Sequence, residues 1–265
     1  MFATSVFLAC QTEISNSEEK SAKHKTESTS KVSTSEKALP HWSYNGETEP
    51  EHWPELEVSS ACDGAYQSPV NLVNYSADKS LIPIAFFYND STHIYNVKNN
   101  GHTIQYNFDA GDYLNYNGTR YNLAQFHFHE PAEHLVEGIR YPMEIHLVHK
   151  SAGGHFAVIA IMAKEKHSSP TFDFLEAYLP LAEGEVKTID KAFSIENMLP
   201  VNRNYFAYTG SLTTPPCTEK VRWLVMQQPI EVSLNQVEKL KANLPKPNYR
   251  PEQPLNGREI LASDF

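Results

Sequence analysis

The sequence predicts a single, mainly β domain with a few short helices. Short segments rich in Tyr, Phe, Val and Ile alternate between apolar and polar residues, and Asn, Gly and Asp separate them. This pattern is typical of strands joined by turns. From residue 39 onward the chain contains no repeat, no low-complexity break and no linker, so we expect one domain.

The alternating segments predict the individual elements in chain order. Strands are expected at 92–100, 102–108, 114–123, 125–129, 143–150, 155–163 and 221–228. The sequences DAGD at 109–112 and YNGT at 116–119 predict hairpin turns. Helices are expected at 169–181 and 233–244, and the second opens with Ser233 and Gln236 as a capping box.

The first 38 residues differ in composition from the rest. Residues 1–10 end in a short apolar run and Cys10, while residues 11–38 are rich in Ser, Thr, Glu and Lys. We predict a signal remnant at 1–10 with Cys10 lipidated as in bacterial lipoproteins, a disordered tether at 11–38 and the folded domain at 39–265. A clipped secretory signal with an incidental cysteine is the alternative. Both interpretations predict an exported protein, either periplasmic or anchored to the outer membrane as a lipoprotein.

The composition and the cysteines of the chain limit which kinds of molecule it is expected to bind and indicate a disulfide. The formal net charge is −10 and no basic stripe is present, which argues against a nucleic-acid partner. No stretch approaches the roughly 18 apolar residues that span a bilayer, so we expect membrane contact only through an N-terminal lipid. Cys62 and Cys217 are predicted to form a disulfide, because a pair of cysteines in an exported protein is usually bridged.

The segment QFHFHEPAEH, at 125–134, is too polar for an ordinary core strand. Side chains on a strand alternate between its faces, so Gln125, His127 and His129 should share one face. HEPAEH does not match the H-E-x-x-H pattern of metalloproteases, because the spacing is one residue too long and Pro131 breaks a helix.

A second segment, MEIHLVHK at 143–150, places Glu144 and His146 on one face in the same way. If the two segments are neighbouring strands, three imidazoles converge, which is the ligand pattern of catalytic zinc with an open position. Gln125 and Glu144 each precede a histidine by two positions and could accept its other ring N–H.

A cupin-type metal oxygenase is a competing interpretation of the same residues. His127, His129 and Glu133 fit its H-x-H pattern followed by a glutamate, which binds iron or manganese. However, the glycines expected around that motif are absent, and the later strand that carries its last histidine has no clear match.

Several segments together resemble the α-class carbonic anhydrases, in particular those of bacteria, and the similarity covers residues 41–265. They are HWSYNG (41–46), QSPVNL (67–72), NNGHTIQYNF (99–108), QFHFHEPAEH, MEIHLVHK, GSLTTPPCTE (210–219) and NYRPEQPLNGREI (248–260). The resemblance implies a twisted, largely antiparallel ten-stranded sheet. It also implies zinc-dependent reversible hydration of CO2 to bicarbonate and a proton, by attack of a zinc hydroxide. A non-catalytic binding module of the same fold stays an alternative, although such members usually lack a ligand histidine.

The resemblance also assigns roles around the metal. It implies that Zn2+ is bound by His127, His129 and His146. The partners that orient these ligands would be Gln125, Glu144 and the backbone carbonyl of Asn248. Thr213, backed by the Glu133 carboxylate, would orient the nucleophile, and Thr214 would line the bicarbonate site.

Further roles implied by the resemblance concern CO2, the proton and inhibitors. The apolar wall for CO2 would consist of Val148, Val158, Leu212, Val221 and Trp223. His102 would shuttle the proton to buffer, because a histidine has a pKa near neutrality, and Tyr44, Asn100 and Gln105 would order the intervening waters. Sulfonamides and inorganic anions are expected inhibitors, and a homodimer is compatible with the family.

Overall fold

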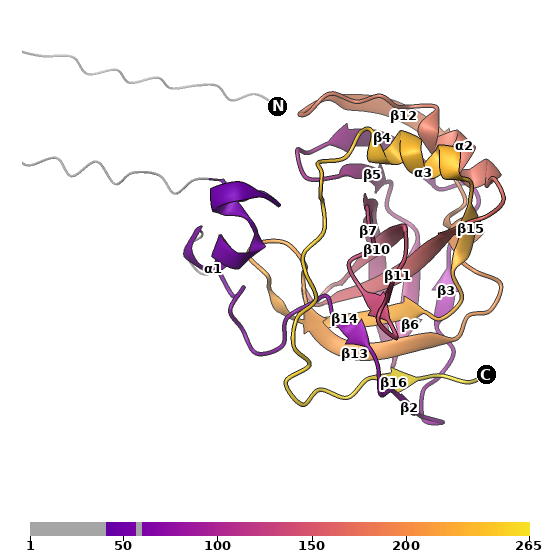
Figure 1. The fold of residues 1–265 in the computed structure, drawn as a ribbon. Helices are drawn as coiled ribbons and strands as arrows, with labels where there is room; N and C mark the ends of the chain where they lie inside the picture. Colours follow the sequence, from indigo (N-terminus) through magenta and orange to yellow (C-terminus); the bar gives the residue numbers. More distant parts are fainter. Residues whose placement is uncertain (1–40, 57–59) are drawn as a thin grey trace, which may run out of the picture. The chain divides into compact units, whose positions relative to one another are not determined.

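The computed structural model describes residues 41–56 and 60–265, and Figure 1 shows their arrangement. The predicted signal remnant, Cys10 and the predicted tether all lie outside these residues. Within them, no helix is both long enough and apolar enough to cross a membrane.

Strands dominate the described chain, as predicted, and the helices are short. The α-helices are α1 (Trp53–Leu56), α2 (Pro170–Glu176) and α3 (Leu234–Lys241), and the 3-10 helices are η1 (Gly46–Thr48), η2 (Pro50–His52) and η3 (Ile195–Met198). The strands are β1 (Asn71–Leu72), β2 (Ser76–Ala77), β3 (Ala85–Phe87), β4 (His93–Asn99), β5 (Ile104–Phe108), β6 (Tyr113–Tyr116), β7 (Thr119–His129), β8 (Leu135–Val136), β9 (Ile139–Arg140), β10 (Met143–Ser151), β11 (Phe156–Glu165), β12 (Val186–Ala192), β13 (Tyr205–Ser211), β14 (Glu219–Met226), β15 (Ile230–Val232) and β16 (Leu261–Ala262).

One large sheet organises the described residues, and its main path contains ten strands in the order β12-β4-β5-β7-β10-β11-β14-β13-β16-β2. Strands β3, β6 and β15 pair off this path, while β1, β8 and β9 form a small separate sheet. Most neighbours in the large sheet are antiparallel, and the β11–β14, β11–β15 and β16–β2 pairs are parallel. The prediction of a largely antiparallel ten-stranded sheet is confirmed.

The central strands alternate their side chains as the sequence predicts. Phe126 and Phe128 of β7 and Ile145 and Leu147 of β10 are fully buried in the main hydrophobic core, on one face of the sheet. Helices α2 and α3 contribute to this core, and Figure 1 shows them together near β12 and β4. The opposite face of β7 and β10 is thereby left for the histidines.

The two predicted turns have different outcomes. YNGT is a hairpin turn, because Asn117 and Gly118 both have positive φ (48° and 73°) and Tyr116 pairs with Thr119 across it. DAGD does not join paired strands, so that prediction is wrong. The eleven-residue strand β7 is long enough to pair with β6 along its first half and with β5 along its second.

Both predicted helices are present but shorter than expected. The helix predicted at 169–181 ends at Glu176, ahead of Pro180, which disfavours helical backbone in the residue before it. The helix predicted at 233–244 ends at Lys241, and its predicted capping box is confirmed. The Ser233 hydroxyl accepts from the backbone N–H of Gln236, whose side chain accepts from the Ser233 N–H.

The capping box predicts a stability effect with a matched control in the same protein. Ser233→Ala removes the hydroxyl acceptor and should destabilise the protein by about 1 kcal/mol in urea unfolding. Ser169 occupies the same N-cap position of α2 but makes no side-chain cap hydrogen bond, so Ser169→Ala should change stability much less. Equal losses for the two variants would contradict this account of the α3 cap.

Candidate active site

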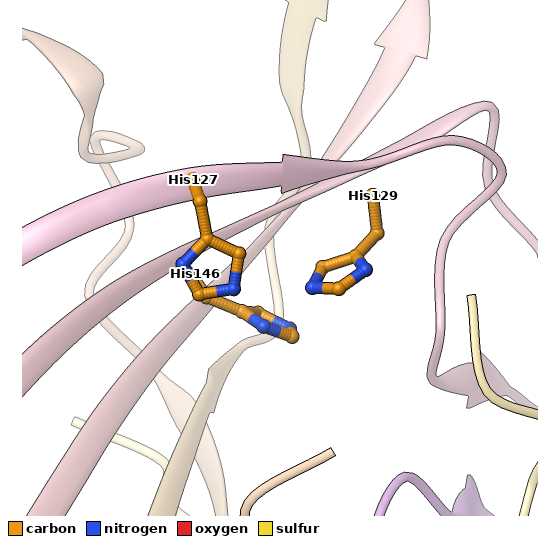
Figure 2. Close-up of side chains that lie close together, drawn as sticks. All are labelled: His127, His129 and His146. Carbon is orange, nitrogen blue, oxygen red and sulfur yellow. The ribbon is translucent and has the colours of Figure 1, made fainter. Parts of the chain in front are cut away.

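Three histidines converge where β7 and β10 pair. The antiparallel register places His146 directly opposite His127 and places Glu144 opposite His129. The ring centroids of the three histidines lie 4.6 to 5.2 Å apart, and one ring nitrogen from each lies within 4.8 Å of the others. Figure 2 shows the three rings turned toward one another.

Each of these rings uses one nitrogen in a hydrogen bond that points away from the centre. His127 Nδ1 lies 2.9 Å from Gln125 Oε1, His129 Nδ1 lies 2.7 Å from the carbonyl oxygen of Asn248, and His146 Nε2 lies 2.7 Å from Glu144 Oε1. All three acceptors are oxygens, so they fix the ring orientations and the tautomers. This leaves Nε2 of His127, Nε2 of His129 and Nδ1 of His146 for the centre.

This donor set fits a metal ion. His129 Nε2 is buried and has no hydrogen-bond partner within the described chain, a costly state for a polar atom unless something else binds it. Imidazole nitrogens suit zinc, copper, iron and nickel. The candidate metal ligands that lie together are His127, His129 and His146, without Glu133. A cupin site would instead need Glu133 as a ligand.

Burial keeps the three imidazoles neutral. It lowers the pKa of His127 well below the usual value, and the neighbouring His129 and His146 lower it further. Burial also lowers the pKa of His129 to about 4 and lowers the pKa of His146. Neutral imidazole is the form that binds metals, so no protons need to be displaced from the site at neutral pH.

Glu144 is the most heavily used carboxylate of the site. It is fully buried and accepts from the backbone N–H groups of Glu133 and His134, each at 2.8 Å. Oε1 is also 2.6 Å from His134 Nδ1 in addition to its contact with His146. Burial opposes ionisation, but the two histidines more than offset it and hold the pKa of Glu144 well below its usual value.

Hydrogen bonds continue from His134 away from the metal centre. His134 Nε2 lies 2.6 Å from the hydroxyl of Tyr208, which lies 2.9 Å from Ser68 Oγ. All these side chains are buried. His134 therefore lies behind the site and supports Glu144, in a position that suits a structural role.

Glu133 and Thr213 lie next to the histidines. Glu133 is fully buried, its Oε1 accepts from the backbone N–H of Arg250 at 2.8 Å, and its Oε2 lies 3.5 Å from His129 Nε2. Burial raises the pKa of Glu133 to about 7, although the charge of His146 acts in the opposite direction. Glu133 Oε2 has no hydrogen-bond partner among residues 41–56 and 60–265.

An apolar cavity of about 190 Å³ opens beside His127 and His146. Val221 was predicted to form part of the CO2 wall but does not line this cavity. It is fully buried, in a hydrophobic cluster that includes Val158 and Trp223. The other lining residues are Gln125, Val148, Phe156, Val158, Leu212, Thr213, Thr214 and Trp223.

A second cavity, of about 130 Å³, leads from the histidines to His102. It shares Gln125, His127 and Thr214 with the apolar cavity. The remaining lining residues are Trp42, Tyr44, Asn100, His102, Thr103, Gln105 and His129. The predicted shuttle and water-ordering residues are thus brought together around one hollow.

Hydrogen bonds within the second cavity fix the loop that carries His102. Asn100 Oδ1 accepts from the backbone N–H groups of His102 and Thr103, at 3.0 and 2.8 Å. Asn100 Nδ2 lies 3.4 Å from Gln105 Oε1. Burial, followed by the charge of His41, lowers the pKa of His102 to about 4, well below the near-neutral value that the sequence predicts.

The predicted disulfide between Cys62 and Cys217 is present, with the Cα atoms 4.9 Å apart. The backbone N–H of Cys217 donates to the carbonyl of Thr214 at 2.8 Å. Arg250 donates from Nη2 to the carbonyl of Cys62, also at 2.8 Å. The bridge therefore connects the segment that carries Thr213 to a distant part of the chain.

Sequence reasoning missed several residues that support the site. Arg250 is 1% exposed and its Nη1 donates to Gln67 Oε1 and to the Ser68 carbonyl, at 2.8 and 2.9 Å. Tyr208 and Ser68 extend the hydrogen bonds behind Glu144. Arg250 and Ser68 lie inside segments that carry the family resemblance, and Tyr208 lies two residues before GSLTTPPCTE. These positions were the available signal, but nothing in the spacing of the three residues indicates burial.

The fold and the site define a metal-dependent enzyme built on a large β-sheet, and comparison with known proteins identifies its family. Residues 48–264 match the family model described as eukaryotic-type carbonic anhydrase. A carbonic anhydrase of Pectobacterium carotovorum is 36% identical over 223 residues, covering 83% of this chain and 90% of that protein. Mouse carbonic anhydrase 7 is 32% identical over 258 residues, covering 84% and 97%.

Solved structures agree with this family. The α-carbonic anhydrase of Thermovibrio ammonificans, in complex with the inhibitor sulfanilamide, matches with a TM-score of 0.80 and 38% identity, over 83% of this chain and 98% of that one. The Photobacterium profundum α-carbonic anhydrase matches with a TM-score of 0.78 and 39% identity, over 83% and 100%. The chain belongs to the α-class carbonic anhydrases, and its activity is the reversible hydration of CO2 to bicarbonate and a proton.

The contacts of Glu144 predict a pH-dependent loss of stability. Because its pKa is lowered by folding, its contribution is present above the unfolded-chain pKa of about 4.3 and is lost as pH falls toward the folded value. Glu144→Gln would face several N–H donors with an amide and should cost about 3 to 5 kcal/mol at pH 7. The difference should shrink below pH ~4.

Urea unfolding of chelated protein at pH 7 and at acidic pH measures this difference without a contribution from metal affinity. The control is Glu231→Gln. The pKa of Glu231 is also lowered, to about 2, by hydrogen bonds from Lys166 and His167, but this carboxylate lies at the surface, so its loss should change stability little. Similar losses for both variants would refute the special position of Glu144.

Proposed function

We propose that the metal of this carbonic anhydrase is a zinc ion held by His127, His129 and His146. The observation that carries the proposal is the set of three inward imidazole nitrogens whose opposite nitrogens are all occupied. A three-histidine set with an open position is typical of catalytic zinc, which lowers the pKa of water to about 7. Gln125, Glu144 and Asn248 would hold the ligand rings in place.

Thr213 would orient the attacking water. A hydroxyl that donates its proton to a carboxylate must accept with its lone pairs, so a Thr213–Glu133 pair would select one orientation of the nucleophile. Support comes from the position of Thr213 in the cavity wall and from Glu133 Oε2, which is buried and has no other hydrogen-bond partner within the described chain. Glu133 Oε1 is already occupied by the Arg250 N–H, which would keep Oε2 facing the site.

The apolar cavity would bind CO2. CO2 has no net dipole, so a wall without hydrogen-bonding groups accommodates it better than it accommodates water. Val148, Val158, Leu212 and Trp223 would form this wall, and Thr214 would contact bicarbonate where the two cavities meet. Val221 would act indirectly, through the hydrophobic cluster that it shares with Val158 and Trp223.

Each turnover also releases a proton that must leave the cavity. His102 would carry it to buffer, since it lies on the wall of the cavity that leads from His127 and His129. Tyr44, Asn100 and Gln105 line the same hollow and would order the waters between. Sulfonamides and inorganic anions would inhibit by occupying the open metal position, as suggested by the sulfanilamide complex of the Thermovibrio enzyme.

We also propose that the enzyme acts outside the cytoplasm. The Cys62–Cys217 disulfide is consistent with export. Residues 1–10 would be a signal remnant with Cys10 as the lipidated residue, residues 11–38 a tether, and residues 39–265 the catalytic domain, giving a periplasmic or outer-membrane-anchored lipoprotein. The membrane would be contacted only through the lipid, and a homodimer remains compatible with the family.

The zinc proposal predicts the effect of removing a ligand. His127→Ala, His129→Ala and His146→Ala should each weaken zinc binding by more than about 100-fold, which exceeds the typical effect of losing an orienting partner. Metal analysis and CO2 hydration by stopped flow measure both properties on one sample. His155→Ala removes an exposed histidine and is the control. Full zinc content and activity in any ligand variant would contradict the assignment.

The role of Thr213 predicts that activity and metal content separate. Thr213→Ala should keep about one zinc per chain yet lower the rate of CO2 hydration on the order of 100-fold, because orientation is lost while coordination remains. Thr209→Ala, at an exposed position on β13, is the matched control. If Thr213→Ala hydrates CO2 at the rate of the parent enzyme, the residue is only part of a loop.

A further inference from the structure

A second histidine lies beyond His102 on the way to solvent. His41 Nε2 lies 2.9 Å from His102 Nε2, and the ring centroids are 5.0 Å apart. His41 is exposed, whereas His102 is partly buried on the wall of the cavity. A hydrogen bond between two imidazole nitrogens contains a single proton, so one ring donates and the other accepts. The two rings therefore span the distance from the cavity to solvent.

An aromatic platform holds this pair in place. His102 stacks on Trp42 with a centroid distance of 3.6 Å and an interplanar angle of 13°. Trp42 is 8% exposed and packs edge-on against Trp53 and Tyr44, at 5.1 and 5.5 Å. Because Trp42 is fixed by these neighbours, the stacked His102 ring keeps Nε2 directed at His41.

The surroundings of His102 favour passing a proton on. Burial and His41 lower the pKa of His102 to about 4, so this ring does not retain a proton at neutral pH. The titratable neighbours are Tyr44, whose ring lies 6.3 Å away and whose pKa burial raises well above its usual value, and Glu183, whose carboxylate approaches Gly101. Among the described residues, His41 is the group that the His102 side chain meets in a hydrogen bond.

We propose that His41 is the second member of a two-histidine proton relay, an inference that rests on the shuttle role proposed for His102. Uptake of a proton at Nδ1 of His102 is matched by transfer of its Nε2 proton to Nε2 of His41. His41 then gives its Nδ1 proton to a buffer base. No electrons move, and both rings finish in the opposite tautomer. Exchange with water, in which each ring loses a proton from one nitrogen and regains one at the other, restores the starting tautomers.

The test compares variants in dilute and concentrated buffer, using the zinc-loaded full chain. His41→Gln keeps a hydrogen-bonding side chain but cannot take up a proton at neutral pH. We expect kcat for CO2 hydration in dilute buffer to fall about threefold with kcat/KM unchanged, and His102→Ala to lower it on the order of tenfold. Concentrated imidazole should restore both. His155→Gln, an exposed histidine on the β10–β11 turn, is the matched control and should behave like the parent.

A second readout does not depend on turnover. In NMR titrations, the His41 and His102 rings should titrate as a coupled pair, and His102→Ala should shift the His41 titration. The His41/His102 double variant should be no slower than His102→Ala alone, because the relay is already interrupted.

The outcomes separate the relay from the shuttle itself. Unchanged turnover of His41→Gln in dilute buffer, with His102→Ala slowed, would overturn the relay and leave the shuttle intact. Unchanged turnover of both variants would reject the shuttle and the relay together. A drop in kcat/KM for His41→Gln would show that His41 supports the structure of the site, which also overturns the relay.

Discussion

The active site depends on the register of one antiparallel strand pair. Because His146 lies opposite His127, and Glu144 lies opposite His129, a single pairing fixes both the ligand triangle and the carboxylate behind it. A slip by one residue would move His127 and His129 into the core and Phe126 and Phe128 into the site. The same aromatic residues that fill the core therefore specify the geometry of the metal centre.

The register alone would leave two buried carboxylates and several imidazoles at a high desolvation cost. For Glu144, hydrogen bonds from two backbone N–H groups and contacts with two histidines offset the desolvation cost, and its pKa is lowered. Within the part of the chain that the structure describes, Glu133 has one backbone donor and one oxygen without a hydrogen-bond partner, and its pKa is raised to about 7. Glu144 is thus a carboxylate whose hydrogen bonds are satisfied, whereas Glu133 keeps unused hydrogen-bonding capacity on the side that faces His129 and His146.

The parts of this arrangement that follow local rules were predictable from the sequence. Period-two alternation assigned the faces of β7 and β10, the Asn-Gly turn located a hairpin, and Ser233 with Gln236 located a helix start. Strand β12 was missed because it lies at the sheet edge and only Ile189 in it is buried. Strand β13 was missed because all of its residues except Thr209 are buried, so it shows no alternation. Arg250 and the His41–His102 contact join residues more than 60 positions apart, so only the fold reveals them.

Two routes lead away from the three histidines, one through hydrogen bonds and one through a cavity, and they differ in burial. The set through Glu144, His134, Tyr208 and Ser68 is fully buried and connects side chains that fix one another. A proton entering it would have no exit to water, so it suits rigid support of His146. The other route passes a polar hollow to His102 and reaches an exposed histidine. Since CO2 hydration must release one proton per turnover, the proposed mechanism combines the buried set, which holds the histidines in place, with the route through His102, which reaches solvent.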